Sequence, residues 1–287
     1  MNRTHLARLL CGAAFVVVAT VAASASAAGI KSEIDVPGGG FVSVGTDCPR
    51  NTALVSQGFG TKGFTVDGPG GTVVRIDSHR SGTGLAGGAQ NFGTAQGVFD
   101  AYAYCSKAGR NIRVVRSKEF VAAGTFGTAR ATCPRGRVPV GGGFGAPGFA
   151  GSTVQAITLT SRRQGRAWQV EALAQGGGAT ARGGIGMSGR LVAYAYCMKN
   201  APKITVRKQS VTVDQAGLKT AVATCPKGRE AISGGFDGDI RLSGTPQASG
   251  VVVSRRAMHG RAWKGRAISV NETGGATATI YAYCIKS

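Results

Sequence analysis

Arginine and tryptophan recur together twice in this sequence, in the same order and at similar spacing. The two groups are Arg162, Arg163 and Arg166 before Trp168, and Arg255, Arg256 and Arg261 before Trp263. Guanidinium groups form paired hydrogen bonds with phosphate and carboxylate. We therefore predict that these six arginines contribute to a polyanion-binding surface. The alternative is that they are solvated loop residues, and for the two tryptophans we favour a place in the core.

Residue types that could support catalysis or bind a cofactor occur in the chain, but without a supporting context. Asp77, Ser78 and His79 are triad residue types, yet neighbours on a strand face opposite sides, so Ser78 and His79 could not meet there. The segment 143–148 matches G-x-G-x-x-G, but no strand-to-helix pattern accompanies it. The chain holds only 13 acidic residues, and no carboxylate pair recurs. We expect a non-enzymatic protein without a cofactor.

The cysteines are placed for disulfides. Of seven, Cys11 lies in the N-terminal apolar segment, and the others alternate between two repeated contexts. One context is a Cys-Pro step, and the other is the end of a Tyr-Ala-Tyr-Cys motif. Six cysteines allow 15 pairings, and the repetition selects one bridge per copy. The predicted pairs are Cys48–Cys105, Cys133–Cys197 and Cys225–Cys284.

A zinc site is the competing use of these cysteines. It would need more histidine or cysteine in each copy, and only His79 and His259 lie outside the N-terminal segment. We therefore predict no metal site. In the chain-entropy model, a bridge that closes a loop of this size contributes about 4 kcal/mol to stability.

The contexts of the cysteines belong to a longer unit that occurs three times. The cysteines of its Cys-Pro steps are spaced by 85 and 92 residues. Eleven residues after each of these cysteines lies a phenylalanine that is preceded by glycine. A lysine lies two residues after each Tyr-Ala-Tyr-Cys. We divide the chain into an N-terminal leader, 1–27, and three copies, 28–109, 110–201 and 202–287. Copies two and three are the most similar, and copy one lacks the tryptophan.

The local pattern within a copy indicates strands and turns. Short, partly alternating apolar runs are separated by glycine clusters, and sustained helical periodicity is absent outside the leader. We expect about six strands per copy. The Cys-Pro-x-Gly step predicts a turn with a left-handed residue at Gly136 and Gly228, for which Asn51 substitutes in copy one. The predicted fold is all-β, with three tandem disulfide-closed repeats that form either small sandwich or barrel units or a pseudo-three-fold, β-prism-like assembly.

The N-terminal segment resembles a secretory signal peptide. Basic residues precede a short apolar run, and small residues of the A-x-A type follow it, around Ala25 to Ala28. The apolar run is short for a membrane span, and no later run is long enough, so we expect no integral span. Export also provides the oxidising setting that the disulfides need. We predict a secreted, extracellular protein, with attachment to the cell wall as an option.

Positive charge dominates the exported part. The leader carries two of the 34 basic residues and none of the 13 acidic ones, which leaves a net charge of +19. Such a charge favours anionic polymers as partners: a wall polymer, an acidic glycan or extracellular nucleic acid. The other interpretation is that the charge serves only solubility.

Copy two contains, in this order, Cys133-Pro134-x-Gly136, Gly141-Gly142-Gly143-Phe144, Trp168 and Ala193-Tyr194-Ala195-Tyr196-Cys197. This series resembles repeats of secreted actinobacterial proteins of uncharacterised function. The resemblance covers nearly the whole exported part and implies an architecture, with no defined activity. A looser similarity connects the Cys-Pro-x-Gly and Gly-Phe words with three-fold β-prism proteins of the vitelline membrane outer layer family. Those units are much shorter than the copies in this chain.

The function predicted from these features is that of a non-enzymatic extracellular or envelope-associated repeat protein that binds polyanionic polymers through basic loops. The first alternative is a structural or matrix protein without a specific ligand. The second is a secreted hydrolase or enzyme inhibitor with its site in the loops of one copy, for which the divergent copy one is the place to look.

Overall fold

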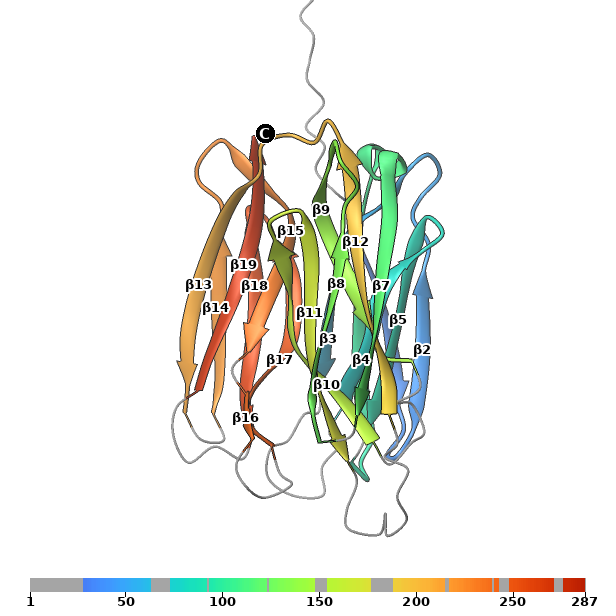
Figure 1. Ribbon diagram of the computed structural model, residues 1–287, viewed down its shortest axis with the longest axis vertical. Helices are drawn as coiled ribbons and strands as arrows, with labels where there is room; N and C mark the ends of the chain where they lie inside the picture. Colours follow the sequence, from blue (N-terminus) through green and yellow to red (C-terminus); the bar gives the residue numbers. More distant parts are fainter. Residues whose placement is uncertain are drawn as a thin grey trace, which may run out of the picture.

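The computed structural model describes ten segments of the chain, and the account below is confined to them. They are residues 28–62, 73–91, 93–122, 124–147, 154–176, 188–214, 217–238, 240–242, 248–270 and 276–286. The predicted leader lies outside them. The described chain is all-β, as the sequence predicts, and its only helical element is one short 3-10 helix. Long strands run nearly parallel to one axis of the molecule (Figure 1).

The strands follow one another in the same way in each third of the chain. Copy one contains β1 (Ala28–Val36), β2 (Phe41–Thr46), β3 (Ala53–Lys62), β4 (Val73–Ser81), β5 (Gly84–Asn91) and β6 (Gly97–Ser106). The 3-10 helix η1 (Lys107–Asn111) leads into copy two, which contains β7 (Ile112–Ala122), β8 (Phe126–Thr132), β9 (Arg137–Gly145), β10 (Val154–Gln164), β11 (Ala167–Gly176) and β12 (Ser188–Lys199). Copy three contains β13 (Thr205–Val213), β14 (Leu218–Thr224), β15 (Arg229–Gly238), β16 (Ile240–Leu242), β17 (Ala248–His259), β18 (Ala262–Val270) and β19 (Ala276–Lys286).

The strands form three antiparallel sheets, and every sheet combines strands of two copies. We name them sheet A (β1-β6-β3-β17-β18-β14, with β16 on β17), sheet B (β2-β5-β4-β9-β12-β7) and sheet C (β13-β19-β15-β10-β11-β8). When the short β16 is left out of the count, the first, sixth and third strands of one copy meet, in each sheet, the fourth, fifth and second strands of another. This strand order fits the three-repeat organisation. It corresponds to the closed, β-prism-like arrangement of the two that the sequence allowed, since separate sandwich units would not share sheets.

The two halves of each sheet meet over a very short stretch. In sheet C, β10 and β15 pair only at Thr160 with Asp237 and at Ser161 with Phe236. The corresponding contacts between β9 and β4 and between β3 and β17 are equally short. A sheet joined over two residue pairs separates on either side of the join. This geometry leaves room for side chains or a groove between the halves.

Three phenylalanines mark these joins and meet inside the molecule. Phe59, Phe144 and Phe236 are almost fully buried. The ring of Phe236 lies edge-on to the other two, at centroid distances of 5.9 Å from Phe59 and 6.1 Å from Phe144. The Gly-Phe step that recurs after each Cys-Pro is therefore the contact between the copies, and burying aromatic surface from all three stabilises the assembly as a unit.

The aromatic residues of the repeats are mainly core residues. Trp168 and Trp263 have no exposed surface, as the core interpretation expects. Trp168 packs edge-on to Tyr283 at 5.7 Å, and Trp263 packs edge-on to Tyr104 at 5.4 Å. In each pair the two residues come from different copies, so the aromatic contacts, like the phenylalanines, join one copy to the next.

Disulfides and left-handed turns lie where the sequence places them. The bonds are Cys48–Cys105, Cys133–Cys197 and Cys225–Cys284, the same pairs that the repetition predicts. Asn51, Gly136 and Gly228 all adopt positive φ, with values of 65°, 78° and 74°. Each bond thus ties the turn before a third strand to the end of the sixth strand of the same copy.

Candidate functional site: a basic end and an outer-face groove

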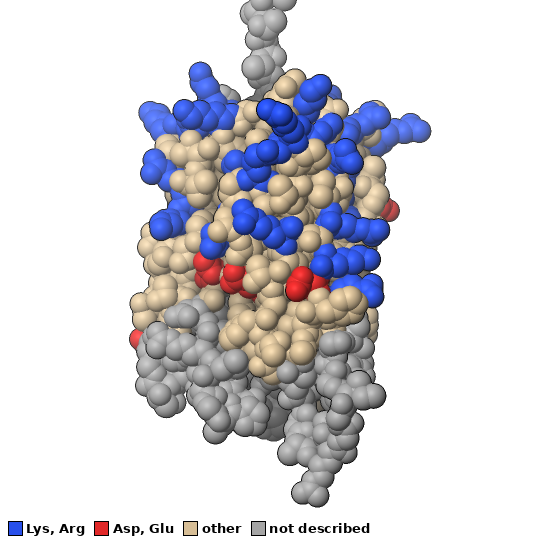
Figure 2. Space-filling view, viewed as in Figure 1, with Lys and Arg blue, Asp and Glu red and all other residues tan. Residues whose placement is uncertain are grey.

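Lysine and arginine side chains gather toward one end of the molecule. Figure 2 shows them crowded over the upper half of one face, with acidic side chains in a band at mid-height. This upper end is the end at which the C-terminus lies in Figure 1. The Cys-Pro turns and the hairpins between the fourth and fifth strands meet here, since the main-chain N–H of Cys133 donates to the carbonyl of Arg166, and that of Cys225 to the carbonyl of Arg261. We call this region the basic end.

The charge of the basic end comes from turns, connectors and strand ends of all three copies. Its lysines and arginines include Arg50, Lys107, Arg110, Arg135, Arg137, Arg166, Lys199, Lys203, Lys227, Arg229, Arg261 and Lys286. In the same described turns, connectors and adjoining strand ends, the acidic residues are Asp47 and Glu230. An excess of this size produces a positive potential that extends into solution and attracts polyanions.

Two adjoining grooves at the basic end are defined by Arg137. The first, about 490 Å³ in volume, is lined by Arg110, Asn111, Ile112, Arg113, Arg137, Lys199 and Asn200. The second, about 370 Å³, is lined by Gly136, Arg137, Val138, Arg166, Met198, Asn200 and Ala201. They share Arg137 and Asn200. None of these described lining residues is acidic, so five cationic side chains face the two grooves without a carboxylate among them.

The disulfide of copy two holds the two arginines that flank these grooves. Nη1 of Arg137 donates to the carbonyl of Cys197 at 3.2 Å and to that of Asn111 at 3.3 Å. Nη2 of Arg166 donates to the carbonyl of Cys133 at 2.8 Å. Cys133 and Cys197 are bonded to each other. Both guanidinium groups are therefore hydrogen-bonded to the backbone of the same disulfide-linked pair of cysteines. This restraint reduces the conformational entropy that the two side chains lose on binding an anion.

The six arginines predicted as the polyanion site are not all brought together. Arg166 and Arg261 are exposed at the basic end. Nε of Arg163 donates to the carbonyl of Gly165 at 3.1 Å, and burial lowers the pKa of its guanidinium. Arg255 and Arg256 belong to β17, and their side chains lie outside the described part of the structure.

Arg162, another of the six, is paired with a carboxylate. Its Nε pairs with Oδ2 of Asp237 at 3.2 Å, and its guanidinium lies 5.8 Å from the ring centroid of Tyr281. It therefore faces outward at the join of sheet C. Burial raises the pKa of the Tyr281 hydroxyl, and the neighbouring Asp237 adds to the rise.

The sequence did not indicate Arg110, Arg113 or Lys199 as site residues, and it indicated Arg137 only as added charge at the Cys-Pro-x-Gly turn. A signal existed for Lys199, since a lysine follows the Tyr-Ala-Tyr-Cys word in every copy. The other three are separated from it by more than 60 positions along the chain, and only the pairing of β7, β9 and β12 brings them together.

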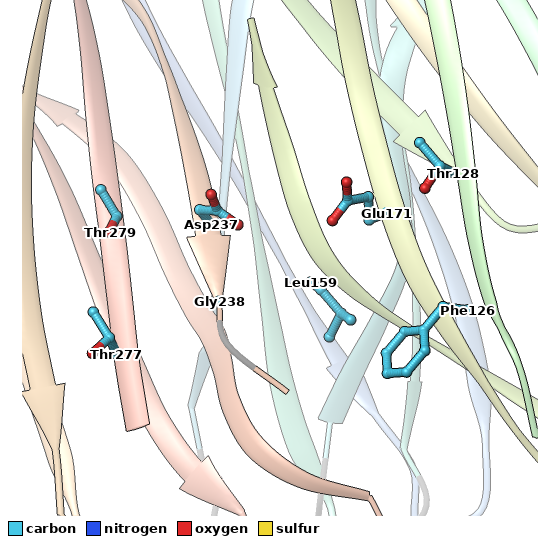
Figure 3. Close-up of a pocket in the computed structure, with 8 residues that line it drawn as sticks. All are labelled: Phe126, Thr128, Leu159, Glu171, Asp237, Gly238, Thr277 and Thr279. Atoms are coloured by element: carbon cyan, nitrogen blue, oxygen red, sulfur yellow. The ribbon is translucent and has the colours of Figure 1, made fainter. Parts of the chain in front are cut away.

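A third groove lies on the outer face of sheet C, below the join of β10 and β15 (Figure 3). It has a volume of about 580 Å³ and is lined by Phe126, Thr128, Leu159, Glu171, Asp237, Gly238, Thr277 and Thr279. Since the two halves of the sheet diverge here, the groove is a direct consequence of their short pairing. We call it the fork groove.

A row of polar residues crosses all six strands, and four of its members form the upper side of the fork groove. Cross-strand pairing places in one row Ser210, Thr279, Asp237, Thr160, Glu171 and Thr128, from β13 to β8. The hydroxyls of Ser210 and Thr279 are 2.8 Å apart. Oγ1 of Thr160 lies 2.7 Å from Oδ1 of Asp237 and 3.3 Å from Oε2 of Glu171. At the usual strand spacing, the row is roughly 24 Å long.

The triad-type residues of copy one occupy the equivalent join of sheet B. The imidazole of His79 stacks on the ring of Tyr194 at 4.4 Å, and its Nδ1 is 3.8 Å from Oδ2 of Asp77. Ser78 is buried, whereas His79 is partly exposed. Burial lowers the pKa of His79 in spite of the nearby carboxylate.

Within the described residues, no three side chains of His, Cys, Asp or Glu cluster in a way that could hold a metal ion. Nor does any described helix have the length and apolar character needed to cross a bilayer. In comparisons with known proteins, the chain matches no protein-family model and no curated protein. The interpretation of its function therefore depends on the geometry of these two surfaces.

Proposed function

We propose that this chain is a secreted, non-enzymatic protein that binds an anionic polymer through its basic end. The observation that supports the proposal most directly is the pair of grooves around Arg137, in which Arg110, Arg113, Arg166 and Lys199 also face the open space. Guanidinium groups attached to a rigid scaffold are suited to repeating phosphate, sulfate or carboxylate groups.

The setting of the site also supports a partner outside the cytosol. Three disulfides favour an oxidising compartment, in agreement with the predicted leader. Wall polymers, acidic glycans and extracellular nucleic acid all repeat a negative charge at short intervals. Because cationic side chains of three copies lie at one end, a polymer can contact several of them at once, which strengthens its retention.

Binding of this kind has a defined dependence on salt. Each neutralised phosphate of duplex DNA contributes about 0.9 to the slope of log K against log salt concentration. Changing both Arg137 and Arg166 to alanine should therefore lower that slope by roughly 2 on duplex DNA and lower the salt concentration that elutes the protein from heparin.

The matched control removes the same charge outside the two grooves. Arg190 is the third residue of β12 and is exposed, and Lys118 is exposed in the middle of β7. The double variant Arg190→Ala/Lys118→Ala should keep most of the affinity for heparin and DNA, with both proteins checked for an unchanged melting temperature. Equal retention of the wild type and of the Arg137/Arg166 variant would refute binding through these grooves.

A further inference from the structure

The fork groove of sheet C has a chemistry unlike that of the basic end. Its polar row contains four hydroxyl residues and two carboxylates, with no lysine or arginine among the six. Figure 3 shows Thr279, Asp237, Glu171 and Thr128 side by side across strands of both halves of the sheet. A polyanion would meet two like charges here, so the basic end and the fork groove suit different ligands.

Below the polar row, the groove has an apolar side. Phe126 lies on β8 with 46% of its surface exposed, and Leu159 lies at the bulge of β10. In Figure 3 both are below the row, on the side toward which β10 and β15 separate. An exposed aromatic ring at the side of a groove is a favourable surface for flat apolar groups.

We infer that the fork groove binds a neutral polysaccharide chain that lies across the strands of sheet C. A sugar ring presents hydroxyl groups at its edges and carbon-bound hydrogens on its faces. The carboxylates of Asp237 and Glu171 accept hydrogen bonds from hydroxyls, and threonine hydroxyls both donate and accept. Phe126 offers its ring to the apolar face of a sugar, in the same groove.

The shape of the site favours a chain over a small molecule. The polar row crosses six strands, and four of its residues, Thr279, Asp237, Glu171 and Thr128, line the groove from β19 to β8. Its carboxylates are also held in place, because Asp237 pairs with Arg162 and contacts Thr160, while Glu171 accepts from Nε2 of Gln169. A ligand therefore meets groups whose positions are already fixed, which reduces the cost of ordering them.

An amine-bearing ligand is the competing possibility, since a cation would also be attracted by the two carboxylates. Asp237 already has a cationic partner in Arg162, which reduces the net charge of the groove. Hydroxyl groups are the commoner polar groups in it, and the apolar side adds nothing to the recognition of a compact ammonium group. These features favour a neutral ligand.

The experiment uses the secreted chain and three hexasaccharides as probes: cellohexaose and chitohexaose, which are neutral, and hexameric chitosan, which is cationic. We expect at least one neutral probe to bind in isothermal titration calorimetry. Phe126→Ala should weaken that binding about tenfold, since it removes a large part of the apolar contact. Glu171→Gln should weaken it as well, because an amide oxygen is a poorer acceptor than a carboxylate.

Two controls match these changes. Phe120→Ala removes another exposed phenylalanine, on β7 of sheet B, and Asp214→Asn removes an exposed carboxylate before β14. Neither should change the affinity for the probe. Binding of the chitosan probe alone would overturn the proposal in favour of a cation site, and a lack of binding by both neutral probes would overturn it outright.

This inference does not depend on the proposed function of the basic end, and the two can fail separately. The Phe126 and Glu171 variants should elute from heparin as the wild type does. The Arg137→Ala/Arg166→Ala variant should in turn bind the neutral probe with unchanged affinity, since those arginines lie outside the fork groove.

Discussion

The hydroxyl of Tyr196 donates a hydrogen bond to Oε1 of Gln57 at 2.6 Å, and joins copy two to copy one across 139 positions of the chain. The amide of Gln57 in turn donates to the carbonyls of Ser78 and Gly142, at 2.7 and 3.0 Å. Gln57 is therefore fully buried with its hydrogen bonds satisfied. From β3 of sheet A, it provides for Tyr196 of sheet B the contact that tryptophan provides for Tyr104 of sheet A and Tyr283 of sheet C.

In copy one, the side chain of Gln57 on the third strand occupies the space that a tryptophan side chain occupies in the other copies. At the position of Gln57, the other copies have Gly142 and Gly234, where a Cβ atom would come within 2.2 Å of Trp168 and Trp263. A side chain larger than glycine and a tryptophan cannot share this space. Copy one, which has Leu85 in place of the tryptophan, has room for glutamine.

Replacing Gln57 by glycine should destabilise the protein by about 2–4 kcal/mol, because it leaves a cavity and deprives the buried Tyr196 hydroxyl of its acceptor. Restoring a tryptophan with Leu85→Trp should recover much of this loss in the double variant, since the pair then matches the other copies. Urea unfolding of the four proteins measures the coupling. If the effects of Gln57→Gly and Leu85→Trp on the free energy of unfolding were purely additive, the two side chains would not compete for the same space.

Removal of the Cys133–Cys197 bond should weaken polyanion binding as well as stability. Changing both cysteines to alanine costs about 2–5 kcal/mol. It also loosens the two carbonyls that hold Arg137 and Arg166. We expect elution from heparin at lower salt under conditions in which the variant is still folded.

The matched comparison for this disulfide is Cys48→Ala/Cys105→Ala, which removes a bond of copy one. At the position of Arg137, four residues after the first cysteine, copy one has Thr52. That variant should lose stability to a similar degree, yet keep its affinity for heparin. If both variants lose affinity equally, the arginines are not positioned by the bond of copy two.

Acid should destabilise the protein through His79. Burial lowers the pKa of His79 from 6.5, so between this ordinary value and the lowered one the unfolded chain binds more protons than the folded chain. The contribution of the neutral imidazole is present above the ordinary pKa and is lost as the pH falls below it. His79→Gln should therefore lower the pH dependence of the unfolding free energy between about pH 7.5 and 5.5. A dependence identical to that of the wild type would show that another group is responsible.

The sequence by itself was sufficient for features that depend on neighbouring or repeated residues. Alternating apolar residues and glycine clusters predict strands and turns, and Asn51 at the position of Gly136 and Gly228 predicts the left-handed turn, because these patterns reflect local backbone preferences. The repeated cysteine contexts select the disulfide pairs. The core position of Trp168 and Trp263 was likewise favoured from the pattern.

Only the tertiary structure decided which copies share a sheet and which side chains meet. The pairing of β10 with β15 rests on two residue pairs, Thr160 with Asp237 and Ser161 with Phe236, and no periodicity along the chain encodes such a contact. The polar row of the fork groove and the grooves around Arg137 both combine strands that are far apart in sequence. Charge and repetition could indicate a basic, three-part protein, but the location of its surfaces depends on long-range strand pairing, which is determined by the packing of the whole assembly.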